Sequence, residues 1–407
     1  MMTLDEALEQ IRQTVTPGPT VTVPIAEAVG CVLAQAIQSD VDVPPFDKSM
    51  MDGYAVRVAD ADQPREVVGV IQAGAAAPHG LAANQTFRIM TGAPVPEGAD
   101  AVVMIEQAEE VPGADGPAVK VPAALRVDQN IQRRASLVAV NDVVAGVGHP
   151  IRAEDLGALL EAGGHQVTVT RPPSLAVLAT GDELVDPTTV PGPQQIRNTN
   201  GPMLVALARQ RGLPVLDLGI AQDEVENLRE RIDQGLAADI LILSGGVSAG
   251  DFDLVPRLLE EAGVQTVFHK VRVKPGKPIW FGKQAGGAIV FGLPGNPVSS
   301  LVGFRLFVQA AIDRFQARSP QGAVSARLSE LFEQRGDRET LFPAWLTFLA
   351  DGQAEVRPVR WRGSADLSAL LSANALIRFP AGPQTFAADQ VVAVYPFESV
   401  FAHRSDE

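Results

Sequence analysis

Three short clusters of glycine and polar residues are the segments of this 407-residue chain best suited to chemistry. Each follows an apolar run that predicts a buried β-strand, so the three should meet at one edge of a sheet. Glycine lets backbone amides approach a phosphate, and a following helix N-terminus favours the anion. The clusters lack Walker A and dinucleotide-binding spacing, so neither ATP hydrolysis nor NAD binding follows. They are T-G-D-E-L (180–184), S-G-G-V-S-A-G-D-F-D (244–253) and L-P-G-N-P-V-S (293–299).

Carboxylates accompany these clusters: Asp182, Glu183, Asp251 and Asp253, with Asp223 at the end of a strand-to-helix loop. Acids beside a phosphate site repel the ligand unless a divalent cation lies between them. Oxygen-rich ligation of this kind suits Mg²⁺. Helix capping is the plainer explanation for Asp223 and for one of the Asp251/Asp253 pair, and it stays open at this point.

The lysines are scarce and clustered. Of six lysines, four lie between residues 270 and 283, and V-K-P-G-K-P (273–278) places Lys274 and Lys277 around a proline-glycine turn. The prolines stiffen this loop and lower the entropic cost of presenting both ammonium groups. A solvated charged loop is the alternative, but the scarcity of lysine elsewhere favours binding of an anion.

The composition excludes several classes of protein. A net charge of −15 argues against nucleic acid or an anionic membrane as a partner. Cys31 is the only cysteine, which rules out intramolecular disulfides and thiolate zinc clusters, and the five histidines are scattered. The sequence contains neither an uninterrupted apolar run of eighteen residues nor a secretory signal, so we expect a cytoplasmic protein without a membrane span.

The periodicity of apolar residues changes along the chain. It predicts helices over 3–15 and 25–35, an all-β region from 52 to 147, and a helix over 153–162. Strands and helices alternate from 174 to 315, with helices over 202–211, 253–263 and 298–315 and one capped by Asp223 with Glu226 in a capping box. This alternation predicts a doubly wound parallel sheet. The segment 317–322 reads as a linker to a small β-barrel.

Taken together, the motifs resemble those of the molybdopterin molybdenumtransferase family, which includes the C-terminal domain of gephyrin. They occur in the family order over about residues 1–400. The matching segments are S-M-M-D-G-Y-A-V (49–56), I-M-T-G-A-P-V-P-E-G-A-D (89–100), T-G-D-E-L (180–184), S-G-G-V-S-A-G-D-F-D (244–253), K-P-G-K-P (274–278), L-P-G-N-P-V-S (293–299) and G-S-A-D-L-S-A-L (363–370).

The resemblance implies a multidomain α/β plus β fold. Residues 1–45 and 146–172 would form an elongated linker domain, and 46–145 an inserted β domain. Residues 173–317 would form a doubly wound α/β molybdopterin-binding domain, and 318–407 a C-terminal β-barrel. The resemblance also implies a homodimer, with the active site between the α/β domain of one subunit and the β domain of the other.

The implied activity belongs to molybdenum-cofactor biosynthesis: insertion of molybdate into adenylylated molybdopterin, assisted by Mg²⁺, with release of AMP. A molybdopterin adenylyltransferase and molybdoenzymes are candidate protein partners. The expected catalytic residues are Asp52, Glu183 and Asp253, and the expected metal ligands are Glu183, Asp223 and Asp253. The residues expected to bind substrate are Thr91, Asp182, Ser244, Gly245, Gly246, Ser248, Lys274, Lys277, Pro294, Gly295, Asn296 and Ser364.

The chain departs from the family pattern at several polar positions. Leu137 stands where the family's G-E-D-I segment has an aspartate, Asn198 replaces the aspartate of D-S-N, Gly201 replaces a following arginine, and Pro343 replaces a barrel arginine. These losses support a second hypothesis, a non-catalytic paralogue that binds molybdopterin or a protein partner. A third, a competence-damage-type nucleotide hydrolase, would require G-G-L-G-P-T and paired aspartates, which S-G-G-V-S-A-G does not match.

Overall fold

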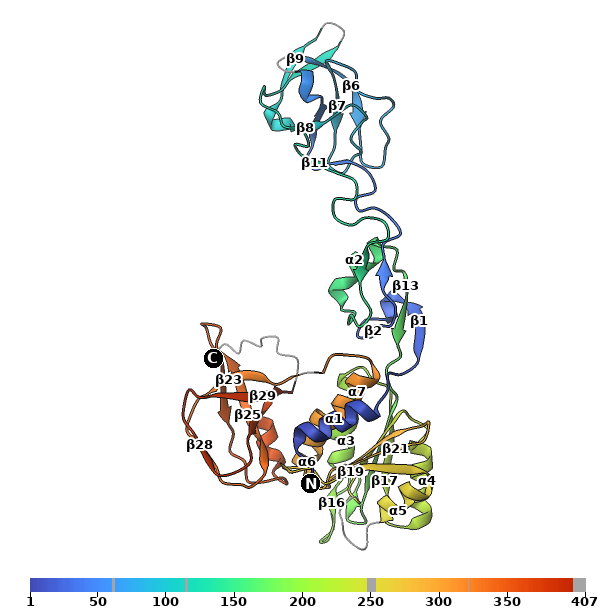
Figure 1. Cartoon of the computed structure of the whole chain (residues 1–407), viewed down its shortest axis with the longest axis vertical. Helices are drawn as coiled ribbons and strands as arrows, with labels where there is room; N and C mark the ends of the chain where they lie inside the picture. Colours follow the sequence, from blue (N-terminus) through green and yellow to red (C-terminus); the bar gives the residue numbers. More distant parts are fainter. Residues whose placement is uncertain (61–62, 114–115, 247–253, 321, 398–407) are drawn as a thin grey trace. The chain divides into compact units, whose positions relative to one another are not determined.

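The computed structural model describes residues 1–60, 63–113, 116–246, 254–320 and 322–397 (Figure 1). The chain divides into two compact units. Unit 1 contains Met1–Val21, Gly30–Val32 and Thr170–Glu407, and unit 2 contains Thr22–Val29 and Leu33–Val169. The backbone therefore passes between the units four times.

A six-stranded sheet forms the centre of the α/β part of unit 1. Its strand order is β17 (Val215–Ala221), β14 (Leu175–Thr180), β18 (Ile240–Ser244), β22 (Ile289–Leu293), β21 (Trp280–Gln284) and β19 (Val264–His269). The first four strands are parallel, whereas β21 is antiparallel to both of its neighbours. The predicted α/β class is therefore confirmed, with an antiparallel edge that the sequence pattern did not reveal.

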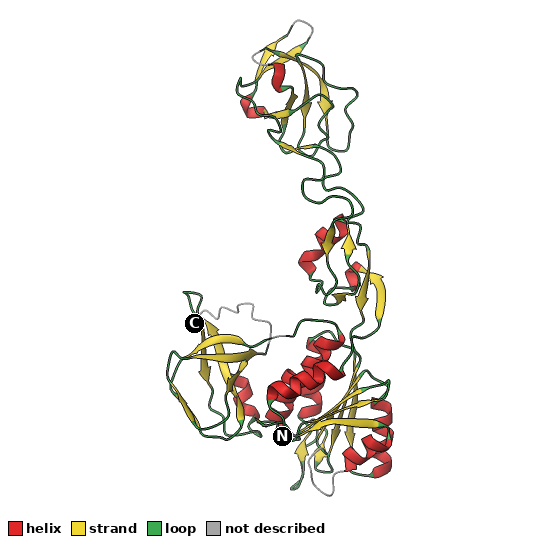
Figure 2. Cartoon of the chain, viewed as in Figure 1, coloured by secondary structure: helices red, strands yellow, loops and turns green. Residues whose placement is uncertain are grey.

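Helices cover both faces of this sheet (Figure 2). Helices α4 (Val225–Gly235) and α5 (Leu254–Glu261) pack on one face, where alternate strand residues such as Leu178 and Leu243 contribute to their core. Helices α1 (Leu4–Thr14), α3 (Asn200–Gln210), α6 (Pro297–Gly303) and α7 (Gln309–Phe315) cover the other face, with the π-helical segment Phe304–Val308 between α6 and α7. Strands buried on both faces explain the continuous apolar runs in the sequence.

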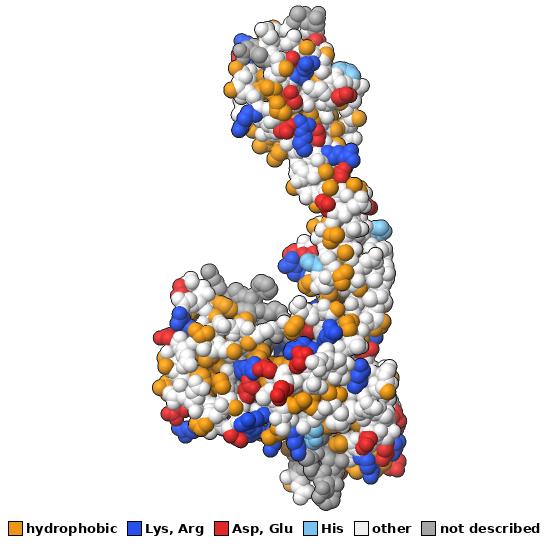
Figure 3. All heavy atoms as spheres, in the orientation of Figure 1, with side chains coloured by type: hydrophobic (Ala, Val, Ile, Leu, Met, Phe, Trp, Pro, Cys, Tyr) orange, Lys and Arg blue, Asp and Glu red, His pale blue; other side chains and the backbone are white. Residues whose placement is uncertain are grey.

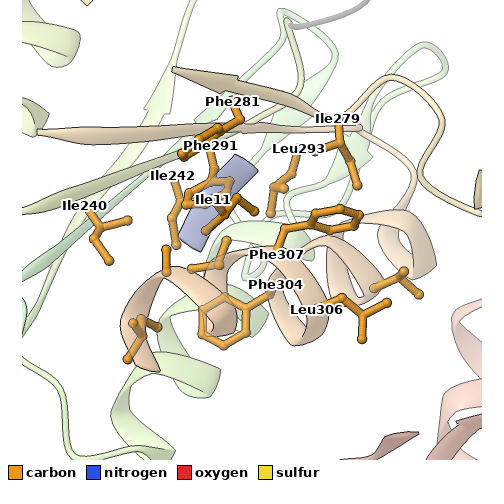
Figure 4. Close-up of a cluster of buried hydrophobic side chains, with 14 of the residues drawn as sticks. Ile11, Ile240, Ile242, Ile279, Phe281, Phe291, Leu293, Phe304, Leu306 and Phe307 are labelled. Atoms are coloured by element: carbon orange, nitrogen blue, oxygen red, sulfur yellow. The ribbon is translucent and has the colours of Figure 1, made fainter. Parts of the chain in front are cut away.

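Helix α1 belongs to this larger core although it lies at the start of the chain. Thr3 and Glu6 form a capping box at its N-terminus. Ile11 lies among buried side chains of the sheet and of the 297–315 helical segment, including Phe291, Phe304 and Phe307 (Figure 4). Residues 1–21 thus share the α/β unit, whereas the resemblance implies a linker domain over all of 1–45; those domain boundaries stay a prediction.

The C-terminal region forms a closed five-stranded barrel, as predicted. The strands follow the order β25 (Glu339–Phe348), β26 (Ala354–Pro358), β23 (Val324–Leu328), β29 (Val391–Pro396) and β27 (Ala375–Phe379), and β27 pairs with β25 to close it. Strand β20 (Val273–Lys274) of the lysine loop adds to β25, with Lys274 opposite Thr340. Arg378 of the barrel also pairs with Asp5 of α1 and with Glu339. The pairing of β20 with β25 and the Arg378–Asp5 ion pair fix the barrel to the α/β part of the unit.

Unit 2 contains the predicted all-β region. Its six-stranded sheet has the order β8 (Ala101–Met104), β5 (Gly53–Val56), β7 (Gln85–Ile89), β6 (Arg65–Ile71), β10 (Pro117–Lys120) and β9 (Glu109–Pro112). Two short pairs join β3 (Ile37–Gln38) to β12 (Val143–Ala145) and β4 (Lys48–Ser49) to β11 (Ile131–Gln132). The helix predicted near 153–162 is present as a 3₁₀ turn, Ala153–Asp155, followed by α2 (Leu156–Glu161). Strands β1 (Thr20–Pro24), β13 (Gln166–Thr170) and β2 (Val32–Leu33) pair in that order.

Two local predictions are wrong. The helix expected over 25–35 is a single 3₁₀ turn, Ile25–Glu27, because Gly30 adopts a φ of +87° and Val32 begins strand β2. Asp223 does not cap a helix: α4 begins after Glu224, which makes no capping hydrogen bond through its side chain. Helix capping therefore does not explain the Asp223 carboxylate.

Candidate functional site

A cavity of about 840 Å³ opens at the carboxyl ends of β14 and β18 in unit 1. The three glycine clusters meet there: Gly181 from the first, Ser244–Gly246 from the second and Gly295–Pro297 from the third. The position matches the general rule for ligand sites on α/β sheets. The lining residues are Ala179, Thr180, Gly181, Glu183, Leu184, Pro191, Gln195, Ile196, Arg197, Asn198, Thr199, Asn200, Asp223, Ser244, Gly245, Gly246, Gly295, Asn296, Pro297 and Ala365. We call this cavity the cleft.

Close packing at Gly245 brings two walls of the cleft together. Its φ is +95°, and a Cβ atom there would lie 2.4 Å from the backbone oxygen of Thr180, so only glycine fits. The Gly245 amide donates to the carbonyl of Leu293 at 3.1 Å. Gly245 thus packs the end of β18 closely against the ends of β14 and β22. Its amide already donates a hydrogen bond to Leu293, so it is not free to hold the oxyanion expected from the sequence.

Asn200 joins two of the turns. Its Nδ2 donates to Ser244 Oγ and to the Gly295 carbonyl, each at 2.8 Å. Behind them, Ser300 Oγ donates to the carbonyl of Pro294 at 2.5 Å. The sequence reasoning did not select Asn200, although its position as the last residue of the N-T-N segment that matches the family's D-S-N was a usable signal.

Carboxylates occupy one side of the cleft. Glu183 and Asp223 line it, and Asp182 Oδ1 accepts a hydrogen bond from the Asp223 amide at 3.0 Å. Burial, together with the negative charges of Asp182 and Glu183, raises the pKa of Asp223. The ion pairs among the described residues include none of these three acids. The local excess of negative charge fits a place for a cation.

The donor set agrees in type with Mg²⁺. Carboxylate oxygens are the ligands that this ion prefers, and it commonly uses one or two of them with water and substrate phosphates. Within the described ranges no group of three or more His, Cys, Asp or Glu side chains converges to hold a metal by itself. The third expected ligand, Asp253, and the expected substrate-binding Ser248 lie outside the described residues.

The predicted basic residues lie away from the lining of the cleft. Lys274 lines a separate cavity of about 220 Å³ with barrel residues, among them Arg335, Trp361 and Arg362. The Lys277 carbonyl accepts from the amide of Val271, which holds the lysine loop in its turn. Neither lysine is among the residues that line the cleft, where the described parts of the three glycine clusters meet.

Ser364 lies where the barrel touches the α/β part of unit 1. Its carbonyl accepts from the amide of Val298 in the first turn of α6, at 3.0 Å. Its neighbour Ala365 consequently lines the cleft. The G-S-A segment of the barrel therefore borders the cleft through Ala365.

Asp52 and Thr91 are brought together in unit 2. Asp52 Oδ1 accepts from the Thr91 amide at 2.7 Å and from the Thr91 hydroxyl at 2.8 Å. These two hydrogen bonds lower the pKa of Asp52, which is therefore ionised at neutral pH. Leu137, the main departure from the family pattern, is also in unit 2 and is 64% exposed.

Two other departures have a local structural explanation. Asn198 Oδ1 accepts from the amide of Gly201 at 3.0 Å in the first turn of α3, a bond that a carboxylate would make equally. A Cβ atom on Gly201 would lie 2.8 Å from Asn198 Nδ2, so a larger residue at position 201 would collide with the Asn198 side chain that makes this hydrogen bond. Pro343 lies within β25, opposite Leu376 of β27, and the structure gives no reason for proline there.

The α/β domain with its polar cleft, the closed barrel and the β domain define a multidomain protein of the MoeA type. Three family models match in succession: "MoeA N-terminal region (domain I and II)" over residues 2–163, "Probable molybdopterin binding domain" over 176–314, and "MoeA C-terminal region (domain IV)" over 325–397. The chain belongs to the molybdopterin molybdenumtransferase family and is an enzyme of that family. The resemblance read from the motifs is thereby confirmed.

Relatives match over nearly their full length. A molybdopterin molybdenumtransferase of Staphylococcus epidermidis is 33% identical, with 98% of this chain and 96% of the relative covered. One of Staphylococcus aureus is 34% identical, with 97% and 95% covered. The crystal structure of a molybdopterin biosynthesis moeA protein from Pyrococcus horikoshii OT3 superposes with a TM-score of 0.81 at 26% identity, covering 97% of this chain and all of that chain.

Proposed function

We propose that this enzyme inserts molybdate into adenylylated molybdopterin and releases AMP. The observation that carries the proposal is the cleft itself: two carboxylates face three glycine-bearing strand ends in the domain matched by the molybdopterin-binding model. Such a site combines a place for a cation with polar groups for an anionic ligand.

Glu183 and Asp223, with Asp253 as a third candidate, would hold Mg²⁺, which would supply positive charge to the phosphoanhydride of the substrate. The protein's own part is positioning. Asn200 holds the Ser244 and Gly295 turns together through its two hydrogen bonds. Gly245 packs closely against the backbone of Thr180 beside them. On the ligand held here, the dithiolene sulfurs would replace oxygens of molybdate, which leave as water, and attack of water on the phosphoanhydride would release AMP.

The family resemblance supports a homodimer in which the β domain of one copy completes the cleft of another. In that arrangement Asp52 and Thr91 would supply a preorganised, ionised carboxylate to the site. Lys274 lines a separate cavity beside the barrel, so a role for Lys274 and Lys277 in holding an oxyanion rests on the family resemblance alone. In the described part of the chain no helix is long and apolar enough to cross a membrane. We place the enzyme in the cytoplasm, where a reducing environment suits its single cysteine.

The test is to mix the purified protein with adenylylated molybdopterin, Mg²⁺ and molybdate and to measure AMP. We expect AMP release that depends on both ions and that Glu183→Gln reduces at least tenfold. Glu161→Gln, a change at the end of α2 in unit 2, is the control and should leave the rate unchanged. Absence of AMP despite binding of the ligand would refute the transferase proposal.

A further inference from the structure

Two polar atoms on the cleft wall are buried and have no hydrogen-bond partner among the described residues. They are Thr180 Oγ1 and Asn200 Oδ1, in residues that are 3% and 8% exposed. Buried polar atoms in folded proteins almost always have a partner, and an unpaired one bears the full loss of its hydration. Two such atoms in one cavity are left unsatisfied by the described part of the chain, and a ligand bound in the cleft would satisfy them.

The orientation of Asn200 is fixed by its neighbours. The Gly295 carbonyl can only accept a hydrogen bond, so the amide nitrogen must face it, and the same nitrogen also reaches Ser244 Oγ. Rotating the carboxamide would place two oxygens against each other. The unpaired oxygen is thus a property of the packing around Asn200.

Thr180 lies beside the S-G-G turn. It is the last residue of β14, and the parallel register that pairs Ala179 with Ser244 puts it next to Gly245. A Cβ atom on Gly245 would lie 3.1 Å from Thr180 Oγ1. The Gly245 amide already donates to the Leu293 carbonyl, whereas the Thr180 hydroxyl beside it makes no hydrogen bond within the described part of the chain.

We propose that the Thr180 hydroxyl donates to a phosphate oxygen of the ligand and that Asn200 Oδ1 accepts from an N–H or O–H group of the same molecule. The inference rests on the proposed function only in taking the cleft as the ligand site. The ligand class is a phosphate ester that also carries hydrogen-bond donors, which describes both a nucleotide and a pterin phosphate. Both residues position the ligand through polar atoms that make no hydrogen bond within the described part of the chain.

The test uses Thr180→Val, which removes the hydroxyl at nearly constant shape, and Thr180→Ser, which keeps it. AMP and inorganic phosphate serve as probes, measured by titration calorimetry on the full chain. We expect Thr180→Val to weaken both probes at least tenfold and Thr180→Ser to stay within threefold of the original affinity. We also expect the urea midpoint of Thr180→Val to equal or exceed that of the unchanged chain, because no internal hydrogen bond is lost.

Thr86→Val is the matched control. Thr86 is fully buried in unit 2, and its hydroxyl donates to the Ala55 carbonyl at 2.7 Å. Loss of this hydrogen bond should lower the urea midpoint and leave the affinities for AMP and inorganic phosphate unchanged. Weaker binding together with undiminished stability is a combination that a merely structural threonine would not give.

Several results would overturn the proposal. Unchanged affinity in Thr180→Val would do so, as would a urea midpoint below that of the unchanged chain. Loss of AMP affinity without loss of phosphate affinity would remove the phosphate assignment, and so would failure of the unchanged chain to bind either probe. Absence of AMP release in the transferase assay, with the Thr180→Val effect intact, would refute the proposed reaction and leave this inference standing.

Discussion

Replacing Asn200 by alanine tests whether the cleft depends on the tie between its turns. The change removes two buried hydrogen bonds, to Ser244 Oγ and to the Gly295 carbonyl. At about 0.5–1.5 kcal/mol each, their loss should destabilise unit 1 by about 1–3 kcal/mol, with loss of the unpaired Oδ1 offsetting part of this. Urea unfolding followed by tryptophan fluorescence measures the effect, because all three tryptophans (Trp280, Trp345 and Trp361) lie in unit 1.

A shift of the urea midpoint by about 0.5–1 M is expected for this loss. The affinity for AMP should also fall at least tenfold, since the Ser244 and Gly295 turns would no longer be held together. Asn374→Ala provides the control: its side chain bonds the amide and carbonyl of Leu346 within the barrel, so it too loses two hydrogen bonds. It should destabilise similarly and bind AMP normally. If Asn200→Ala bound AMP as tightly as Asn374→Ala, the assigned role of Asn200 would be wrong.

Three further predictions concern the same enzyme. The raised pKa of Asp223 means that its contribution to stability is fully present below the ordinary carboxyl pKa of 3.8 and is lost as pH rises through the raised value. Asp223→Asn should therefore make the ligand-free protein more stable at pH 7–8 in urea unfolding, and a lower midpoint there would contradict the charge argument. Gly245→Ala should lose more stability than Gly212→Ala. Both glycines have a positive φ, which costs an alanine about 1–2 kcal/mol, but only at position 245 would the new Cβ atom also collide with a backbone oxygen. Equal decreases in melting temperature would count against close packing at Gly245. Leu137→Asp should change the free energy of unfolding by less than about 0.5 kcal/mol, since the side chain is exposed. The same change should raise the rate of AMP release if the missing aspartate limits turnover. An unchanged rate would show that the site does not use this position.

The sheet and the meeting of the three glycine clusters were predictable because buried strands and their terminal turns leave continuous, local signals. Thr180 and Ser244 were placed at strand ends by the apolar runs that precede them. The antiparallel strand β21 was not predictable in the same way, because W-F-G-K-Q is short and ends in two polar residues, and its direction depends on a pairing with β22. Sequence periodicity carries no information on strand direction.

The polar details of the site were less predictable for a related reason. A capping role for Asp223 was inferred from its spacing to Glu226, yet the helix starts after Glu224 and the carboxylate joins Glu183 on the cleft wall. Local propensity gives helix ends only to within a few residues. The role of Asn200 depends on Gly295, 95 residues away, and no local pattern records such a contact.

The place of helix α1 has a consequence for synthesis of the chain on the ribosome. This helix is made before the sheet and before residues 297–315, yet the side chains that cover Ile11 come largely from the sheet and from Phe304 and Phe307. A ribosome adding about 5–20 residues each second leaves the apolar face of α1 without its partners for the whole time that the intervening segments emerge. Unit 2 can complete its fold in that interval, whereas unit 1 closes only when its first and last segments have both been made.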